Sequence, residues 1–257
     1  MDYNYHTHTF RCHHAVGTPE QYIKKAIKGG VKYMGFSEHI PLMFPDGEES
    51  WYRLHMLDVE LYFKELSILR EKYKEQIEIK IGFEMEYYPL YFYEMLANAR
   101  KFGAEYLILG QHYIKQDGTN HDGSHVFYNT DNHDLKEYVK CVLSGMKSGV
   151  FTYLAHPDVI NFVGDEEVYQ AEMKKICELS KEMSIPIEIN FWGIKNNRNY
   201  PDEHFWKIAG EIGSPVTFGC DAHDAESGFD EKSYEEAKKL VEKYNLNYIG
   251  KPKLVSF

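Results

Sequence analysis

The sequence of 257 residues lacks the features that mark several large classes of protein. It has no excess of basic charge: the formal net charge is −11, whereas nucleic-acid-binding proteins usually carry a basic surface. No apolar run reaches membrane-spanning length, and the polar N-terminus has no apolar segment of the kind found in signal peptides. We therefore expect neither a nucleic-acid partner nor a membrane partner.

Cysteine is scarce as well. The four cysteines form no CxxC pair and no disulfide-dense pattern, which fits a reducing compartment and predicts a cytoplasmic protein. No linker or low-complexity run divides the chain, so we expect one domain over residues 1–257. The sequence does not indicate an oligomeric state.

Histidine, in contrast, is plentiful, with thirteen residues. His6 and His8 lie in a short N-terminal run of aromatic and β-branched residues that is typical of a strand. Side chains two apart on a strand point to the same face, about 7 Å apart. Such a pair suits two imidazoles that bind one metal ion, although two surface histidines at a chain end are the equally ordinary reading.

Strand-like and helix-like segments then alternate along the chain. Expected strands cover 3–9, 33–37, 77–86, 106–109, 151–154, 185–189 and 216–219. Expected helices cover 19–29, 57–73, 90–102, 134–149, 166–183, 202–212 and 234–244, with a short tail at the end. Residues 115–130 form a long loop rich in Gly, Asn and Asp, in which His121 and His125 are candidate lid contacts.

Seven strand–helix repeats predict an α/β fold with a parallel sheet and helices outside. No Gly-rich fingerprint follows any expected strand, which weakens a dinucleotide-binding fold. We favour a distorted, TIM-like (β/α)7 barrel, one unit short of the usual eight. A doubly wound open sheet is the alternative.

Metal-binding residue types recur at the expected strand ends. Barrel active sites form at the carboxyl ends of the strands, and six of the seven expected strands deliver a His, Asp or Glu there. These residues are His6, His8, His39, Glu84, His112, His156, Asp221 and His223. Histidines scattered over a surface would not follow the strand ends in this way.

The motifs also resemble a known family. In order, they are His6-x-His8 with Cys12-His13-His14, Ser37-Glu38-His39, Gly82-Phe83-Glu84, Gln111-His112, Ala155-His156-Pro157 and Gly219-Cys220-Asp221-Ala222-His223. This series, which spans nearly the whole chain, resembles the PHP (polymerase and histidinol phosphatase) superfamily of metallophosphoesterases, and within it the histidinol-phosphate phosphatases.

That resemblance implies a distorted (β/α)7 barrel with up to three divalent ions. His6, His8, Glu84 and Asp221 would hold the first, and Glu84 would bridge to a second held by His112 and His156. The third would be held by His14, His39 and His223. His14 matches the family spacing better than its neighbour His13, and Cys12 is read as packing.

The ligand types point to the same chemistry independently. Imidazole and carboxylate without thiolate favour zinc in a catalytic site and are compatible with iron or manganese. Ions bridged by Glu84 would supply a hydroxide that attacks phosphorus. Glu84, Asp221 and His223 are therefore also the candidate catalytic residues, while the proton donor to the leaving group is left open.

Other residues are candidates for substrate binding. Arg198, after the sixth expected strand, is placed to hold phosphate, whereas Lys195 is more simply read as a solvated loop cation. Glu188 and Asn190 share a strand face and would either orient ligands or bind a substrate amine. Glu86 is read as an outer partner of the metal ligands. Together with Glu38 and Glu188, it makes the active edge acidic, which suits a cationic substrate.

The sequence thus predicts a metal-dependent phosphomonoesterase that hydrolyses L-histidinol phosphate in histidine biosynthesis. Another phosphoester substrate, as in a nucleotide phosphatase or an exonuclease, is the nearest alternative. A non-catalytic metal-binding module is the alternative from a different class, and the presence of all nine expected ligands weighs against it.

Overall fold

Parallel strands organise the computed structural model, which describes residues 1–114 and 125–257. One sheet has the order β1 (Tyr3–Asn4), β2 (Tyr33–His39), β3 (Glu78–Met85) and β4 (Leu107–Leu109). A second has the order β5 (Ile187–Asn190), β6 (Pro215–Gly219) and β7 (Asn247–Tyr248). At least one helix lies between each pair of consecutive strands, as a parallel connection requires.

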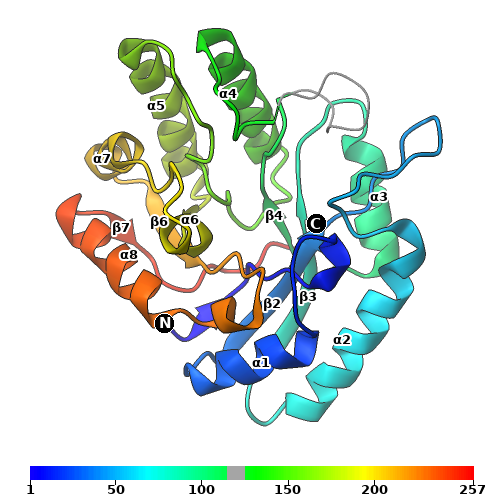
Figure 1. Cartoon of the computed structure of the whole chain (residues 1–257). Coiled ribbons are helices and arrows are strands. Elements are labelled where there is room, and N and C mark those ends of the chain that lie inside the picture. Colours follow the sequence, from blue (N-terminus) through cyan, green and yellow to red (C-terminus); the bar gives the residue numbers. More distant parts are fainter. Residues whose placement is uncertain (115–124) are drawn as a thin grey trace.

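The helices lie around the outside of the strands (Figure 1). They are α1 (Pro19–Lys28), α2 (Val59–Tyr73), α3 (Phe92–Phe102), α4 (Asn132–Lys147), α5 (Glu166–Met183), α6 (Phe191–Lys195), α7 (Glu203–Ile212) and α8 (Glu231–Lys243). None of the helices that the structure describes combines the length and the apolar character needed to cross a lipid bilayer.

Local sequence explains where these helices begin. The backbone N–H of Thr18 donates to the Gln21 side chain 2.7 Å away, and Pro19 occupies the first helical position of α1. The Asp131 carboxylate accepts from the backbone N–H groups of His133 and Asp134. That cap starts α4 at Asn132, two residues before the predicted start.

The two sheets are joined by single bridges rather than by a full strand. Leu154 pairs with Leu109 at the end of β4 on one side and with Ile187 of β5 on the other, and Thr7 pairs with Ala222. Residues 151–154 were expected to be a strand, but in the structure only Leu154 pairs there. The mixed α/β fold is confirmed, with the four-stranded sheet curled as part of a barrel, while a continuous seven-stranded ring is not seen in the described residues.

Three further predictions about local structure were wrong. The first regular strand covers only Tyr3–Asn4, so His6 and His8 follow it on either side of the Thr7 bridge. The segment expected to be a loop at Trp192 forms the short helix α6, with the Asn190 side chain accepting from the backbone N–H of Gly193. The tail contributes β7, which pairs with β6.

The inside of the curled sheet is packed with tyrosine. A small cluster of Tyr3, Tyr5, Tyr106, Ile108, Tyr153 and Ala155 is separate from the main core between strands and helices. Since these residues come from β1, β4 and the segment at Leu154, they fill the space that the strands enclose. The strand register places His39 beside Glu84 and Glu84 beside Ile108. His39 and Glu84 therefore lie in the row that borders this tyrosine cluster at Ile108.

Candidate metal centre

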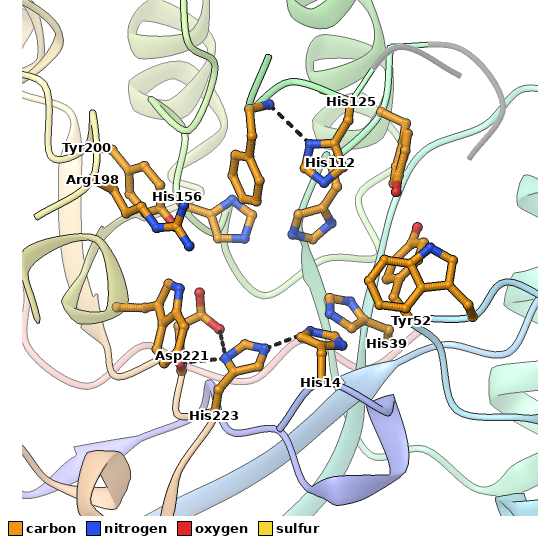
Figure 2. A pocket seen from close by; sticks show the side chains of 14 residues that line it. His14, His39, Tyr52, His112, His125, His156, Arg198, Tyr200, Asp221 and His223 are labelled. Carbon is orange, nitrogen blue, oxygen red and sulfur yellow. Dashed lines mark hydrogen bonds and ion pairs between the residues drawn. The ribbon is translucent and has the colours of Figure 1, made fainter. Parts of the chain in front are cut away.

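A cavity of about 250 Å³ opens beyond the carboxyl ends of the strands (Figure 2). Its lining comprises His14, His39, Trp51, Tyr52, His112, Tyr113, His125, Phe127, His156, Trp192, Arg198, Tyr200, Asp221 and His223. Six of the nine predicted metal ligands therefore line this cavity: His14, His39, His112, His156, Asp221 and His223. His121 lies outside the described residues.

Four buried donor atoms at the cavity floor are spaced as ligands of one ion. Nε2 of His6 lies 3.5 Å from Oε2 of Glu84 and 3.4 Å from Oδ1 of Asp221. Nε2 of His8 lies 3.2 and 3.3 Å from the same two oxygens. A tetrahedral ion with ligands at about 2.1 Å has ligand atoms about 3.4 Å apart. These four distances therefore match four of the six edges of such a tetrahedron.

The second oxygen of Glu84 faces a different pair of histidines. Oε1 lies 2.8 Å from Nε2 of His156 and 3.5 Å from Nε2 of His112. One carboxylate thus presents one oxygen to His6 and His8 and the other to His112 and His156. This is the arrangement expected of a carboxylate that bridges two ions.

A third group lies at the mouth of the cavity. Nε2 of His14 is 3.0 Å from Nε2 of His223, and Nδ1 of His39 is 3.1 Å from Oε2 of Glu84 (Figure 2). Donor atoms of His8, His39 and His223 also lie within 4.8 Å of one another. His39 therefore stands between the floor and the mouth rather than in one group alone.

His13 and His14 are separated by the fold. His13 adopts a left-handed backbone conformation with φ of 64°, and its ring packs at a tilt against His55, with 4.3 Å between the ring centroids. His14 turns the other way, and its Nδ1 lies 2.6 Å from the backbone oxygen of Cys12. The structure brings His14, and not His13, to the cavity.

Cys12 is placed as a packing residue. Its buried thiol donates to the backbone oxygen of Thr9 3.1 Å away. Burial, with the Glu38 carboxylate nearby, raises the pKa of this thiol to about 12, which disfavours the thiolate that a metal would bind.

Carboxylates stand behind several of the histidines. Nδ1 of His6 lies 2.9 Å from Glu188, and Nδ1 of His112 lies 3.0 Å from Glu86. Glu38 lies 3.7 Å from Nδ1 of His8 and accepts from the backbone N–H of Thr9. A proton held on Nδ1 leaves the lone pair of Nε2 facing inward, which is the tautomer a metal requires.

This arrangement corrects the expected substrate contacts. Glu188 and Asn190 are almost fully buried and do not line the cavity: Asn190 donates to Glu188 at 2.9 Å and to Asp221 at 3.1 Å. Both side chains thus contact candidate ligands, Glu188 at His6 and Asn190 at Asp221. Glu38 and Glu86 are equally buried, so the acidic edge expected to meet a substrate ammonium is turned away from it.

The two basic candidates, Arg198 and Lys195, lie in different places. Arg198 lines the cavity and points into it from the loop after α6 (Figure 2). Nζ of Lys195 instead lies 2.8 Å from Asp224 and 2.6 Å from the Ser227 hydroxyl, outside the cavity lining. The structure thus leaves Arg198 as the predicted cation that faces the cavity.

Buried polar atoms without hydrogen-bond partners support a metal at the floor. Among the described residues they include Nε2 of His6, Nε2 of His8, Nδ1 of His39 and Oε2 of Glu84. Leaving one such group unpaired costs about 1–3 kcal/mol. Divalent cations bound in this region would give all four atoms a partner, because the three histidine nitrogens lie 3.1–3.5 Å from Oε2 of Glu84.

The electrostatics of the floor favour a cation as well. Burial alone would raise the pKa of the Glu84 carboxyl, but His112, His6 and His39 outweigh burial and hold that pKa well below its usual range. For His6, burial alone would lower the pKa of the imidazole. The carboxylates of Glu188, Asp221 and Glu84 outweigh burial and raise that pKa well above the usual value. Buried carboxylates thus remain charged and require a positive partner.

Two glycines make room for these carboxylates. A Cβ atom on Gly110 would collide with Oε1 of Glu84, and a Cβ atom on Gly219 would collide with Oε1 of Glu188. Each glycine follows or ends a strand, where the backbone passes close to a neighbouring inward side chain. Any larger residue would push a carboxylate off its histidine.

Sequence patterns missed the aromatic wall of the cavity. Trp51, Tyr52, Tyr113, Phe127, Trp192 and Tyr200 all line it. Trp192 lies in α6 and the others come from loops after three different strands, so no fixed spacing joins them. Their only signal is the high total of Tyr, Phe and Trp, which core packing explains equally well.

Comparisons with known proteins find relatives of this chain. The profile of the PHP domain family matches residues 4–191. The chain is 24% identical over 233 residues to a probable histidinol-phosphatase of Deinococcus radiodurans, covering 87% of each chain. It is 25% identical over 264 residues to the histidinol-phosphatase of Lactococcus lactis, covering 97% of this chain and 93% of the relative.

A solved structure shares the fold. The histidinol phosphate phosphatase of Lactococcus lactis, solved with zinc, L-histidinol and phosphate, superposes with a TM-score of 0.70. The alignment covers 96% of this chain and 95% of the other, at 21% sequence identity. The arrangement of strands and helices is therefore common to both proteins.

The bridging position of Glu84 generates a first prediction. Glu84→Gln should lose metal, because the amide presents only one oxygen and no charge to the two groups of histidines. We expect at least about a hundredfold weaker binding of the most tightly held ion, because the loss of an outer partner alone typically costs about 10–100-fold. Metal content after dialysis, measured by mass spectrometry, checks this.

The matched control is Glu78→Gln, an exposed glutamate at the start of the same strand. It should retain all its metal and melt at the temperature of the unmodified protein. Full metal content in Glu84→Gln would contradict a bridging role.

Proposed function

The chain belongs to the PHP domain family, and from this premise we propose that it is a metal-dependent phosphomonoesterase that hydrolyses L-histidinol phosphate to L-histidinol and phosphate. The observation that carries the proposal is the tetrad of His6, His8, Glu84 and Asp221, in which each histidine Nε2 lies 3.2–3.5 Å from both carboxylate oxygens. Asp221 and Arg198 line the same cavity.

The metal centre would hold up to three divalent ions. His6, His8, Glu84 and Asp221 would hold the first; Glu84, His112 and His156 the second; and His14, His39 and His223 the third. Zinc is favoured by the imidazole and carboxylate ligands, and iron or manganese is compatible with them. Divalent ions in such a centre lower the pKa of a coordinated water and neutralise phosphoryl oxygens.

The fold would support this centre as one distorted (β/α)7 barrel over residues 1–257. The bridges at Leu154 and between Thr7 and Ala222 support that reading, because they connect the two sheets on both sides. Every proposed ligand then lies at one end of the barrel, where active sites of such folds are built.

Arg198 would bind the phosphoryl group inside the cavity that it lines together with Asp221. A guanidinium can donate two parallel hydrogen bonds to phosphate oxygens, which fixes the orientation of the group as well as its charge. Holding phosphorus in one place is most of what a phosphatase has to achieve.

Selection of the leaving group would depend on aromatic contacts rather than on carboxylates. Apart from Asp221, no acidic side chain lines the cavity among the described residues, whereas six aromatic side chains do. Tyrosine and tryptophan faces attract both planar rings and cations. An alcohol that carries an imidazole and a primary ammonium fits such a wall.

The substrate prediction follows from that wall. We expect kcat/KM for L-histidinol phosphate to exceed that for AMP or a simple aryl phosphate by at least about tenfold. The ions do not distinguish one leaving group from another, so this preference would come from the aromatic wall. Phosphate release over a panel of monoesters measures this. Equal rates across the panel would leave a phosphatase but remove the substrate, and preferential cleavage of single-stranded DNA would overturn both.

The mouth of the cavity gives another prediction. His14→Ala should lower kcat/KM at least about tenfold, because it removes a donor atom beside His223. His13→Ala is the matched control, since the His13 ring packs against His55 outside the cavity lining, and it should change kcat/KM less than about twofold. The reverse ranking would show that His13 is the ligand.

A further inference from the structure

The loop that carries Arg198 is held against the turn that carries His156 by two side chains. Asn199 donates from Nδ2 to the backbone oxygens of Val159 and Ile160, each 3.2 Å away. In the opposite direction, Oδ2 of Asp158 accepts from the backbone N–H of Asp202 at 2.6 Å. Each segment thus sends one side chain to the backbone of the other.

The Asp158 half of this contact is anchored in the core. The same Oδ2 atom also accepts from Nε1 of Trp206 at 2.8 Å, and both side chains are almost fully buried. The turn itself is fixed on its other side, where the Tyr138 hydroxyl donates to the backbone oxygen of Pro157 at 2.9 Å. The turn is therefore the rigid partner, and the loop is held to it.

Arg198 needs such support because it is itself exposed. Its backbone N–H donates to the oxygen of Gly193 at 3.0 Å, and its guanidinium lies 5.8 Å from the centre of the Phe127 ring. No salt bridge to Arg198 is found within the described residues. A long, unpaired side chain on a loop loses much conformational freedom when it binds a ligand.

We propose that Asn199 and Asp158 form a reciprocal clamp whose task is to position Arg198 for phosphate. The clamp rests on the proposed function only in that Arg198 is taken to bind the phosphoryl group. Asn199 and Asp158 are positioning residues: they touch neither the cavity nor a phosphate, and they act through the place they give to the Arg198 loop. Tyr200 supports this, because its buried ring lies 6.3 Å from the ring of His156 between the two segments (Figure 2).

The exposed half of the clamp is the one to remove. Asn199→Ala deletes both hydrogen bonds to the turn and leaves the buried Asp158 and Trp206 in place. Asn196→Ala is the matched control, because this asparagine of the same loop donates to Trp192 within its own segment and not to the turn. The probe is inorganic phosphate, titrated calorimetrically into each metal-loaded protein, so that the readout does not depend on turnover.

In the unmodified background, Asn199→Ala should weaken phosphate binding about three- to tenfold, and Asn196→Ala less than twofold. In the Arg198→Ala background, Asn199→Ala should have no further effect, because the residue it positions is gone. Metal content and melting temperature should match those of the Asn196→Ala protein. This non-additivity is what a merely structural asparagine would not produce.

Three results would overturn the clamp: unchanged phosphate binding in Asn199→Ala, the same loss in both backgrounds, or unchanged phosphate binding in Arg198→Ala. Failure of the proposed function has a different signature. A protein that binds phosphate with the predicted coupling, but releases no phosphate from any monoester, would retain the clamp and lose the enzyme. A protein that does not bind phosphate would refute both.

Discussion

The complete burial of the Glu84 carboxylate is the constraint on which the rest of the site depends. A charged carboxylate removed from water is costly unless opposite charge surrounds it. One oxygen faces His6, His8 and His39, and the other faces His112 and His156. Of these histidines, His6 is held from behind by Glu188 and His112 by Glu86. A cation at the centre would give both layers of carboxylate a common partner, so metal binding would be coupled to the folding of this region.

Strand register converts this electrostatic demand into a fixed geometry. Because β2, β3 and β4 run parallel, His39, Glu84 and Ile108 form one row across the inner face of the sheet. The tyrosine cluster fills the space inside the curled sheet. Gly110 and Gly219 let the backbone pass beside Glu84 and Glu188. The donor atoms are thus held by elements of secondary structure and by packing, whereas Arg198 comes from a loop and needs ties of its own.

The distribution of acidic residues changes how the net charge should be read. Glu38, Glu86 and Glu188 lie at the active edge, as expected, but each is buried against a histidine or its supporting backbone. Their charge acts on the metal ligands rather than on a substrate. The surface that a leaving group would meet is aromatic, with Trp51, Tyr52 and Trp192 among its members. An acidic total therefore says little about which substrate a site prefers.

The sequence by itself determined the features that depend on near neighbours. The His6-x-His8 and Asp221-x-His223 spacings, the helix start at Pro19 and the strand that carries Glu84 are all local patterns, because side-chain direction and capping are decided within a few residues. Only the tertiary structure decided that Glu188 stands behind His6, 182 residues away, that His14 and not His13 turns inward, that residues 151–154 pair through Leu154 alone, and that six aromatic side chains wall the cavity. Those contacts arise where the chain closes on itself, and no local spacing encodes which distant segments will meet.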